Sequence, residues 1–253
     1  MVSSTINSFR IFETRQDDEE VISQAFLCQC ANEDIPGIIW RPSQAARSIP
    51  LVLVQHGGSG HKQDESTRVL ARALVSGLGC AVAAIDGPVH GDRGVHRLFN
   101  KSSLQIFRES WIEQTFLHTY VQEWATVIRS LAELEFVDEQ RIAWCGVSMG
   151  TAYGLPLIAD VPAIKTAVLG KWSSNRLNSR HLLDSAARVR CPVLFVHHWD
   201  DERFDFEGSV ELFAALGSED KRMCIYRGPH NSRSQEEVDA YISHLSRTLV
   251  VTK

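Results

Sequence analysis

The sequence is short of long apolar runs, paired cysteines and net positive charge. None of the apolar runs in its 253 residues approaches the length that a membrane-spanning helix needs. Its six cysteines are scattered and include no CxxC pair, so a disulfide framework is not expected in a chain of this length. The first twenty residues contain no apolar stretch behind a charged start, which argues against a signal peptide. We therefore expect a reduced, soluble, cytoplasmic protein without a membrane partner.

Acidic residues outnumber basic ones, 31 Asp and Glu against 26 Lys and Arg, for a formal net charge of −5. This balance argues against nucleic-acid binding through a broad basic face, but it leaves room for a local basic pocket. The sequence also lacks internal repeats, low-complexity tracts and linkers rich in Pro, Gly or Ser. We therefore expect residues 1–253 to form a single domain, and nothing in the sequence indicates its oligomeric state.

The first 42 residues favour antiparallel strands. They contain three short runs, FRIFETR, VISQAFLCQC and IPGIIWRP, in which apolar and polar residues alternate. The cluster Asn32-Glu33-Asp34 between the second and third run, and Pro36-Gly37 at the start of the third, are typical of turns. We expect these runs to lie at one edge of a sheet.

The pattern changes at Pro50. Nearly continuous apolar runs, typical of strands buried on both faces of a parallel sheet, occur at 51–56, 80–86, 141–147, 165–170, 191–198 and 221–228. They alternate with segments of helical spacing at 64–78, 109–135, 149–159, 206–217 and 235–249. This alternation predicts an α/β fold: a mostly parallel central sheet with an antiparallel N-terminal edge and helices on both faces.

Two polar, basic stretches fit neither pattern, at 90–108 and 171–190. Each follows a predicted strand, and in open parallel sheets ligands bind at the carboxyl ends of the strands. Both stretches are candidates for pocket walls or a small cap, with Trp172 as a candidate substrate contact. An anionic substrate is allowed by the basic residues near this edge, which are His61, Lys62, Arg93, Arg97, Arg176 and Arg180.

Ser148 is the candidate nucleophile. It lies in the GxSxG pattern at 146–150, directly after a predicted strand and before a predicted helix. A sharp strand-to-helix turn exposes the serine hydroxyl at the edge of the sheet, and the flanking glycines let the crowded backbone close. A bare GxSxG occurs by chance in about one chain in ten of this length, given about 7% each of Gly and Ser. The placement between strand and helix therefore carries the prediction.

A glycine-rich stretch, His56-Gly57-Gly58-Ser59-Gly60, follows the strand at 51–56. Such a loop can bring the N–H of Gly58 beside the N–H of Met149 at the helix start, so that the two form an oxyanion hole. Gly57 and Ser59 become candidate substrate contacts. The alternative is a phosphate loop, which requires a Lys-Ser/Thr pair entering the helix; His61-Lys62-Gln63 does not provide one.

An acid and a base are expected after later strands. Asp200 and Asp201 follow the strand at 191–198, and His230 follows the strand at 221–228. With Ser148 this gives the chain order Ser, Asp, His that the GxSxG architecture uses. His230 would take the serine proton and deliver it to the leaving group, while an aspartate holds the ring in the correct tautomer. From position alone, either aspartate fits.

The other histidines give weaker signals. The pair at 197–198 and the aspartates after it lack the spacing of a metal site, so no metal ligand is expected. His90 and Arg93 follow the strand at 80–86. They are candidates either for loop architecture or for contact with the substrate.

On these motifs the chain resembles the α/β-hydrolase superfamily from about residue 20 to its end. It is most similar to small dienelactone hydrolase-like and prolyl-oligopeptidase-related serine esterases, through PGIIWRP, VLVQHGGSG, AAIDGPVHGDR, WCGVSMG, PVLFVHHWDDERF and GPH. In these families the acid lies four residues beyond the strand-end histidine, which implies Asp201 when counted from His197. There are two departures. Dienelactone hydrolases proper use Cys where this chain has Ser148, and His198 replaces the usual Gly.

Together the motifs predict a serine hydrolase that cleaves a small-to-medium carboxylic ester through an acyl-enzyme on Ser148. Its expected partner is a small-molecule substrate, and neither a metal nor an organic cofactor is expected. The same machinery serves thioesters, lactones, amides and some carbon–carbon bonds, because the motifs describe an activated serine and not the group that it attacks. An alternative from another class is a ligand-binding receptor on the hydrolase fold with a slow triad.

Overall fold

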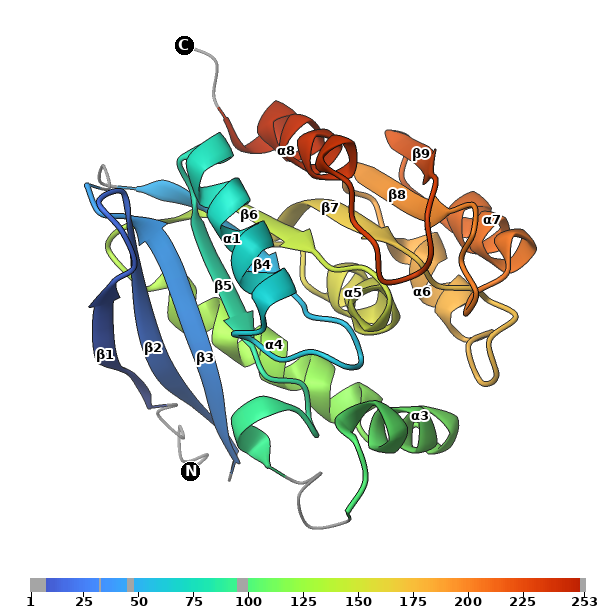
Figure 1. Ribbon diagram of the computed structural model, residues 1–253, viewed down its shortest axis with the longest axis horizontal. Coiled ribbons are helices and arrows are strands. Elements are labelled where there is room, and N and C mark those ends of the chain that lie inside the picture. The colour runs from blue at the N-terminus through green and yellow to red at the C-terminus, as the bar shows by residue number, and fades with distance from the viewer. Residues whose placement is uncertain (1–7, 32, 45–47, 95–99, 251–253) are drawn as a thin grey trace, which may run out of the picture.

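A nine-stranded sheet with helices on both faces forms the molecule (Figure 1). The computed structural model describes residues 8–31, 33–44, 48–94 and 100–250. The strands are β1 (Phe9–Gln16), β2 (Val21–Cys30), β3 (Glu33–Pro42), β4 (Ile49–Val54), β5 (Ala81–Ile85), β6 (Val137–Cys145), β7 (Ile164–Gly170), β8 (Val193–His198) and β9 (Lys221–Tyr226). The helices are α1 (Glu65–Leu78), the short 3₁₀ helix η1 (Gly91–Arg93), α3 (Ser103–Glu113), α4 (Leu117–Ala132), α5 (Met149–Asp160), α6 (Leu182–Arg188), α7 (Phe206–Ala215) and α8 (Gln235–Leu249).

The strand order confirms the predicted fold class. Across the sheet it runs β1-β2-β3-β5-β4-β6-β7-β8-β9. The pairings from β1 to β5 are antiparallel, and those from β5 to β9 are parallel. The sheet therefore has an antiparallel N-terminal edge and a parallel centre, as the α/β-hydrolase resemblance implies.

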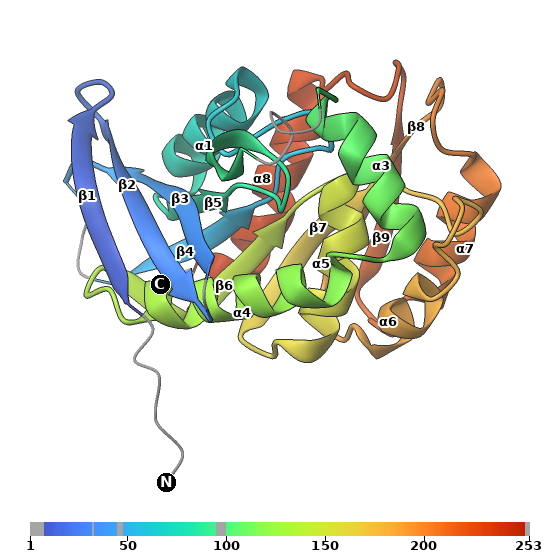
Figure 2. The same ribbon diagram turned by 90° about the horizontal axis from the view of Figure 1, so that it is seen from below.

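Helices on both faces create two apolar cores that share the sheet. Figures 1 and 2 show α1 and α8 on one face and α4, α5 and α6 on the other. Alternate residues of β4 point to opposite cores: Leu51 and Leu53 to that of α4–α6, and Val52 and Val54 to that of α1 and α8. Every residue of β4 and β5 is buried, which explains why these strands are apolar without interruption.

The prediction of a single helix at 109–135 is wrong in one respect. Two helices, α3 and α4, occupy this region, and Gln114 between them adopts a left-handed conformation with φ of 53°. Helix α3 begins at 103, inside the stretch predicted as irregular, because the Ser102 side chain accepts a hydrogen bond from the N–H of Gln105 and so caps the helix. The other irregular stretch, 171–190, contains the short helix α6. Of the first stretch, residues 95–99, with Arg97, lie outside the described residues.

The parallel strands bring their following loops to one edge of the sheet. The glycine-rich loop follows β4, Ser148 follows β6, Asp201 follows β8 and His230 follows β9. Because all four strands point the same way, residues far apart in the sequence meet at this edge. In the part of the chain that the structure describes, no helix is both long and apolar enough to cross a membrane.

Candidate active site

Ser148 sits on a strained turn between β6 and α5. Its φ of 59° and ψ of −120° are unusual for a residue with a side chain. Its N–H donates a hydrogen bond to the carbonyl of Gly170 at the end of β7, 2.9 Å away, which holds the turn. A Cβ on Gly146 would lie 2.9 Å from Trp144 Nε1 and 3.0 Å from the Cα of Gly150. Glycine at 146 is therefore required by packing inside the turn.

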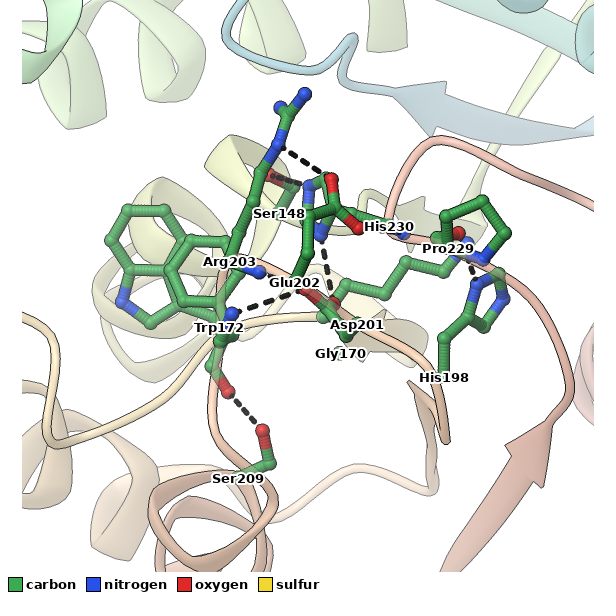
Figure 3. Close-up of polar contacts among 12 residues, drawn as sticks. Ser148, Gly170, Trp172, His198, Asp201, Glu202, Arg203, Ser209, Pro229 and His230 are labelled. Atoms are coloured by element: carbon green, nitrogen blue, oxygen red, sulfur yellow. Dashed lines mark hydrogen bonds and ion pairs between the residues drawn. The ribbon is translucent and has the colours of Figure 1, made fainter.

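Ser148, His230 and Asp201 form a continuous chain of hydrogen bonds (Figure 3). His230 Nε2 lies 3.0 Å from Ser148 Oγ, and His230 Nδ1 lies 2.8 Å from Asp201 Oδ2. Because a carboxylate only accepts, Nδ1–H donates to Asp201 and Nε2 is left to accept from the serine hydroxyl. The His230 and Asp201 side chains are 4% and 0% exposed, so little water competes for these contacts.

The structure also distinguishes the two neighbouring aspartates. Asp200 accepts hydrogen bonds from the Arg227 side chain and the Gly228 N–H, and it is not part of the chain to Ser148. Burial raises the pKa of Asp201, but the hydrogen bond and charge of His230 outweigh burial, helped by the N–H groups of Arg203 and Phe204. The pKa of Asp201 therefore lies below its ordinary value, and the group is a carboxylate at neutral pH.

The loop that carries His230 is held by a buried polar cluster that the sequence analysis missed. Glu237 on α8 accepts hydrogen bonds from His198, Tyr241 and Lys171. His198 Nδ1 also lies 2.9 Å from the carbonyl oxygen of Pro229, the residue directly before His230 (Figure 3). The side chains of Lys171, His198 and Glu237 are 3%, 1% and 0% exposed. Only the unusual His198 after the strand-end histidine signalled this cluster in the sequence.

Two hydrogen bonds hold the glycine-rich loop in place. Its carbonyl at Gly58 accepts a hydrogen bond from His90 Nε2 at 2.9 Å, and His56 Nε2 accepts one from the N–H of Gly87 at 2.9 Å. Burial lowers the pKa of His56 to about 4, so this ring is neutral at physiological pH. Met149 begins α5 next to Ser148. Among the described residues, no turn, loop or cap hydrogen bond uses the N–H of Gly58 or Met149, so both are available to a ligand.

Two cavities meet at Ser148 and Gly58. The larger one, about 190 Å³, is polar and is lined by His230 together with residues of the glycine-rich loop. The smaller one, about 30 Å³, is bounded by the buried rings of Phe107, Trp172 and Phe204. It does not include His230 among its walls. Both cavities include Gly58, Ser148 and Arg203 in their lining, and they differ in their remaining walls.

The structure separates the residues that the sequence grouped as candidate substrate contacts. Gly57 and Ser59 line the larger cavity, and Trp172 lines the smaller one. His90 and Arg93 line neither of the two cavities. His90 is fully buried behind Gly58, and Arg93 forms a bidentate ion pair with Glu123 of α4 at 2.6 and 2.8 Å.

No group of three or more His, Cys, Asp or Glu side chains is arranged to hold a metal ion within the described ranges. The pair at 197–198 is instead divided between separate environments. His197 lies 5.4 Å from the ring of Phe206, centroid to centroid, whereas His198 binds Glu237.

Solved structures of esterases are similar to this chain over most of its length. A cold-adapted esterase from an Arctic intertidal metagenomic library, solved with PEG bound, shares 31% identity, with 94% of this chain and 100% of that chain covered and a TM-score of 0.80. An acetyl xylan esterase from a Paenibacillus species has 16% identity, coverage of 96% and 89%, and a TM-score of 0.69. Acetyl xylan esterase 1 from a Thermoanaerobacterium species has 13% identity, coverage of 96% and 88%, and a TM-score of 0.72. No protein-family model and no curated protein matches the chain.

Proposed function

The chain belongs to the esterases of the α/β-hydrolase fold, and from this premise we propose that it hydrolyses small-to-medium carboxylic esters through an acyl-enzyme on Ser148. The observation that carries the proposal is the hydrogen-bond chain from Ser148 Oγ through His230 to Asp201. Side chains and water suffice for this chemistry, so we expect no cofactor to be needed.

In the first half of the reaction, His230 Nε2 takes the proton of Ser148 as Oγ attacks the ester carbonyl carbon. The carbonyl oxygen becomes negatively charged and accepts hydrogen bonds from the N–H groups of Gly58 and Met149, which stabilise it most in the transition state. The ester C–O bond then breaks, and His230 gives its proton to the departing alcohol. Asp201 stabilises the imidazolium throughout by accepting from Nδ1–H.

In the second half, a water molecule replaces the alcohol. His230 takes a proton from this water, which attacks the acyl carbon and forms a second negatively charged intermediate in the same oxyanion hole. The bond between Ser148 Oγ and the acyl carbon breaks, and the proton returns to Oγ. The carboxylic acid leaves and the enzyme is restored.

Each of the two cavities can hold one half of the ester, either the alcohol or the acyl group. The alcohol must lie near His230, which protonates it, and His230 lines only the larger cavity. The acyl group therefore enters the smaller cavity and packs against the rings of Phe107, Trp172 and Phe204. Since that cavity is about 30 Å³, short acyl groups fit and long ones do not.

A series of p-nitrophenyl esters from acetate to decanoate, given to the wild type and to Ser148→Ala, tests this function. The wild type should turn over the short esters best, and the variant should lose at least about 10⁴ in kcat while keeping the wild-type melting temperature. Equal turnover by a correctly folded variant would rule out Ser148 as the nucleophile. If the wild type binds esters without hydrolysing any, the receptor alternative gains support.

A further inference from the structure

Three arginines converge on the small cavity beside Ser148. Arg108 comes from α3, Arg176 from the segment after β7, and Arg203 from the loop after β8. The arginines lie at the boundary between buried rings and solvent. The rings of Phe107, Trp172 and Phe204 are at most 7% exposed. Arg176 is half-buried, and Arg108 is exposed. Among the described residues, no Asp or Glu lines this cavity.

Most other basic side chains near this edge of the sheet have carboxylate partners. Those partners are Asp86 and Asp92 for Lys62, Glu123 for Arg93, Glu237 for Lys171 and Glu211 for Arg180. Arg203 contacts Glu202 at 3.2 Å. Arg108 and Arg176 form no ion pair with any described residue. The residues outside the described ranges contain no Asp or Glu, so the chain offers no further acidic side chain for the two arginines.

The positive charges of the two unpaired arginines, Arg108 and Arg176, repel each other. Burial and the charge of Arg108 both lower the pKa of Arg176, and no nearby acid offsets them. The guanidinium of Arg176 lies 6.0 Å from the centre of the Phe204 ring, which keeps it beside the cavity. Two like charges held together in this way favour binding of an anion between them, because an anion relieves their repulsion.

We propose that the preferred acyl group of this esterase ends in a free carboxylate, as in the half ester of a short dicarboxylic acid, and that Arg108 and Arg176 bind that carboxylate. The inference rests on the proposed function, in which the acyl group occupies the small cavity. The short carbon chain packs against the rings of Phe107, Trp172 and Phe204 in the small cavity, and the carboxylate reaches the arginines at the rim of that cavity. Arginine suits this role because its planar fork binds a carboxylate through two hydrogen bonds.

The reaction remains an ester hydrolysis. Ser148 Oγ forms a bond to the ester carbon, the bond to the alcohol oxygen breaks, and the alcohol leaves with the proton carried by His230. Water then cleaves the acyl-enzyme, and the product is the dicarboxylate. The distant carboxylate takes no part in bond making; it orients the acyl chain.

Ethyl hydrogen succinate and ethyl pentanoate form a matched pair of substrates, because they differ only in a terminal carboxylate against an ethyl group. Hydrolysis is followed by pH-stat for the wild type, Arg108→Gln, Arg176→Gln and the double variant. The wild type should prefer the half ester in kcat/KM, and the double variant should lose that preference by about ten- to a hundredfold, because its kcat/KM falls far more for the half ester than for ethyl pentanoate. Raising the ionic strength should weaken the wild-type preference.

Arg180→Gln is the control, because Arg180 is already paired with Glu211 at 2.6 Å and lies outside both cavities. It should leave both rates unchanged. A wild type that hydrolyses ethyl pentanoate as well as or better than the half ester would overturn the inference and leave the proposed function standing. So would a double variant that loses both activities equally. Failure of the wild type on both esters and on the p-nitrophenyl series would instead overturn the proposed function.

Discussion

At the scale of single residues, the candidate active site has two neighbouring aspartates in different environments. Asp201 is buried against His230, whereas Asp200 is more exposed and bound to Arg227 and Gly228. Because only Asp201 touches the histidine ring, only Asp201 can hold Nδ1–H and leave Nε2 free to accept the serine proton.

Replacing Asp201 by Asn should therefore lower kcat for a short ester by about 10³–10⁴ with little change in fold, because an amide can donate to Nδ1 and so stabilise the wrong tautomer. Steady-state kinetics with p-nitrophenyl acetate measure the effect. The matched control is Asp200→Asn, which should keep nearly full activity. Loss of activity in Asp200→Asn, with Asp201→Asn active, would reverse the roles assigned to the two residues.

At this scale, the sequence indicates a residue where the order of strands and motifs along the chain carries the signal. Ser148 follows a strand in GxSxG, and His230 follows the last strand, so both could be predicted from the chain alone. The choice of Asp201 over Asp200 needed the family resemblance. The pairings of His90 with Gly58 and of Arg93 with Glu123 could not be predicted, because the partners lie about thirty residues apart and no local pattern marks such a pairing.

At the scale of elements, helix α8 supports the candidate active site through Glu237. Burial raises the pKa of Glu237 on this helix, but His198, Lys171 and Tyr241 outweigh burial and lower it to about 2. A folded-state pKa below the ordinary 4.5 means that the carboxylate stabilises the fold. This contribution is fully present above about pH 4.5 and is lost as the pH falls toward 2.

Glu237→Gln should lower the free energy of unfolding by about 3 kcal/mol at pH 7, and the difference from the wild type should shrink at pH 3. Urea unfolding at both pH values measures the two differences. The exposed neighbour Glu236 supplies a control, since Glu236→Gln should change stability little at either pH. An equal loss for Glu237→Gln at both pH values would contradict the role of the ionised carboxylate.

The elements themselves were largely predictable, and the exceptions have a physical cause. The apolar runs matched all six parallel strands. Strands β4, β5 and β8 are buried at every residue and must be apolar throughout, whereas the edge strand β9 has no buried residue. The boundary between α3 and α4 could not be found, since it contains neither Pro nor Gly and Gln114 supplies the left-handed residue. Helical spacing continues across this break, so the pattern predicted one long helix.

At the scale of the whole molecule, the continuous sheet joins the two cores. Residues that alternate along one strand pack into both, so neither core can lose its structure without exposing the other face of the same strands. Tryptophan fluorescence reports on both cores. The core of α1 and α8 contains Trp40. The core of α4–α6 contains four tryptophans, which are Trp111, Trp124, Trp144 and Trp172.

Thermal unfolding should therefore be a single transition, with the same midpoint by tryptophan fluorescence and by far-ultraviolet circular dichroism. Coincidence of the two probes is the expected result, because the shared sheet couples the cores. Two separated midpoints would contradict the expectation of one domain over the whole chain.

The central claim is that Ser148 is the activated nucleophile of this esterase, and covalent labelling tests it most directly. Wild-type protein treated with a fluorophosphonate should gain the mass of one phosphonyl group, and peptide mapping should locate it on Ser148. Ser148→Ala, folded as the wild type, should gain no mass. Labelling of another residue in the wild type, or undiminished labelling of Ser148→Ala, would contradict the account.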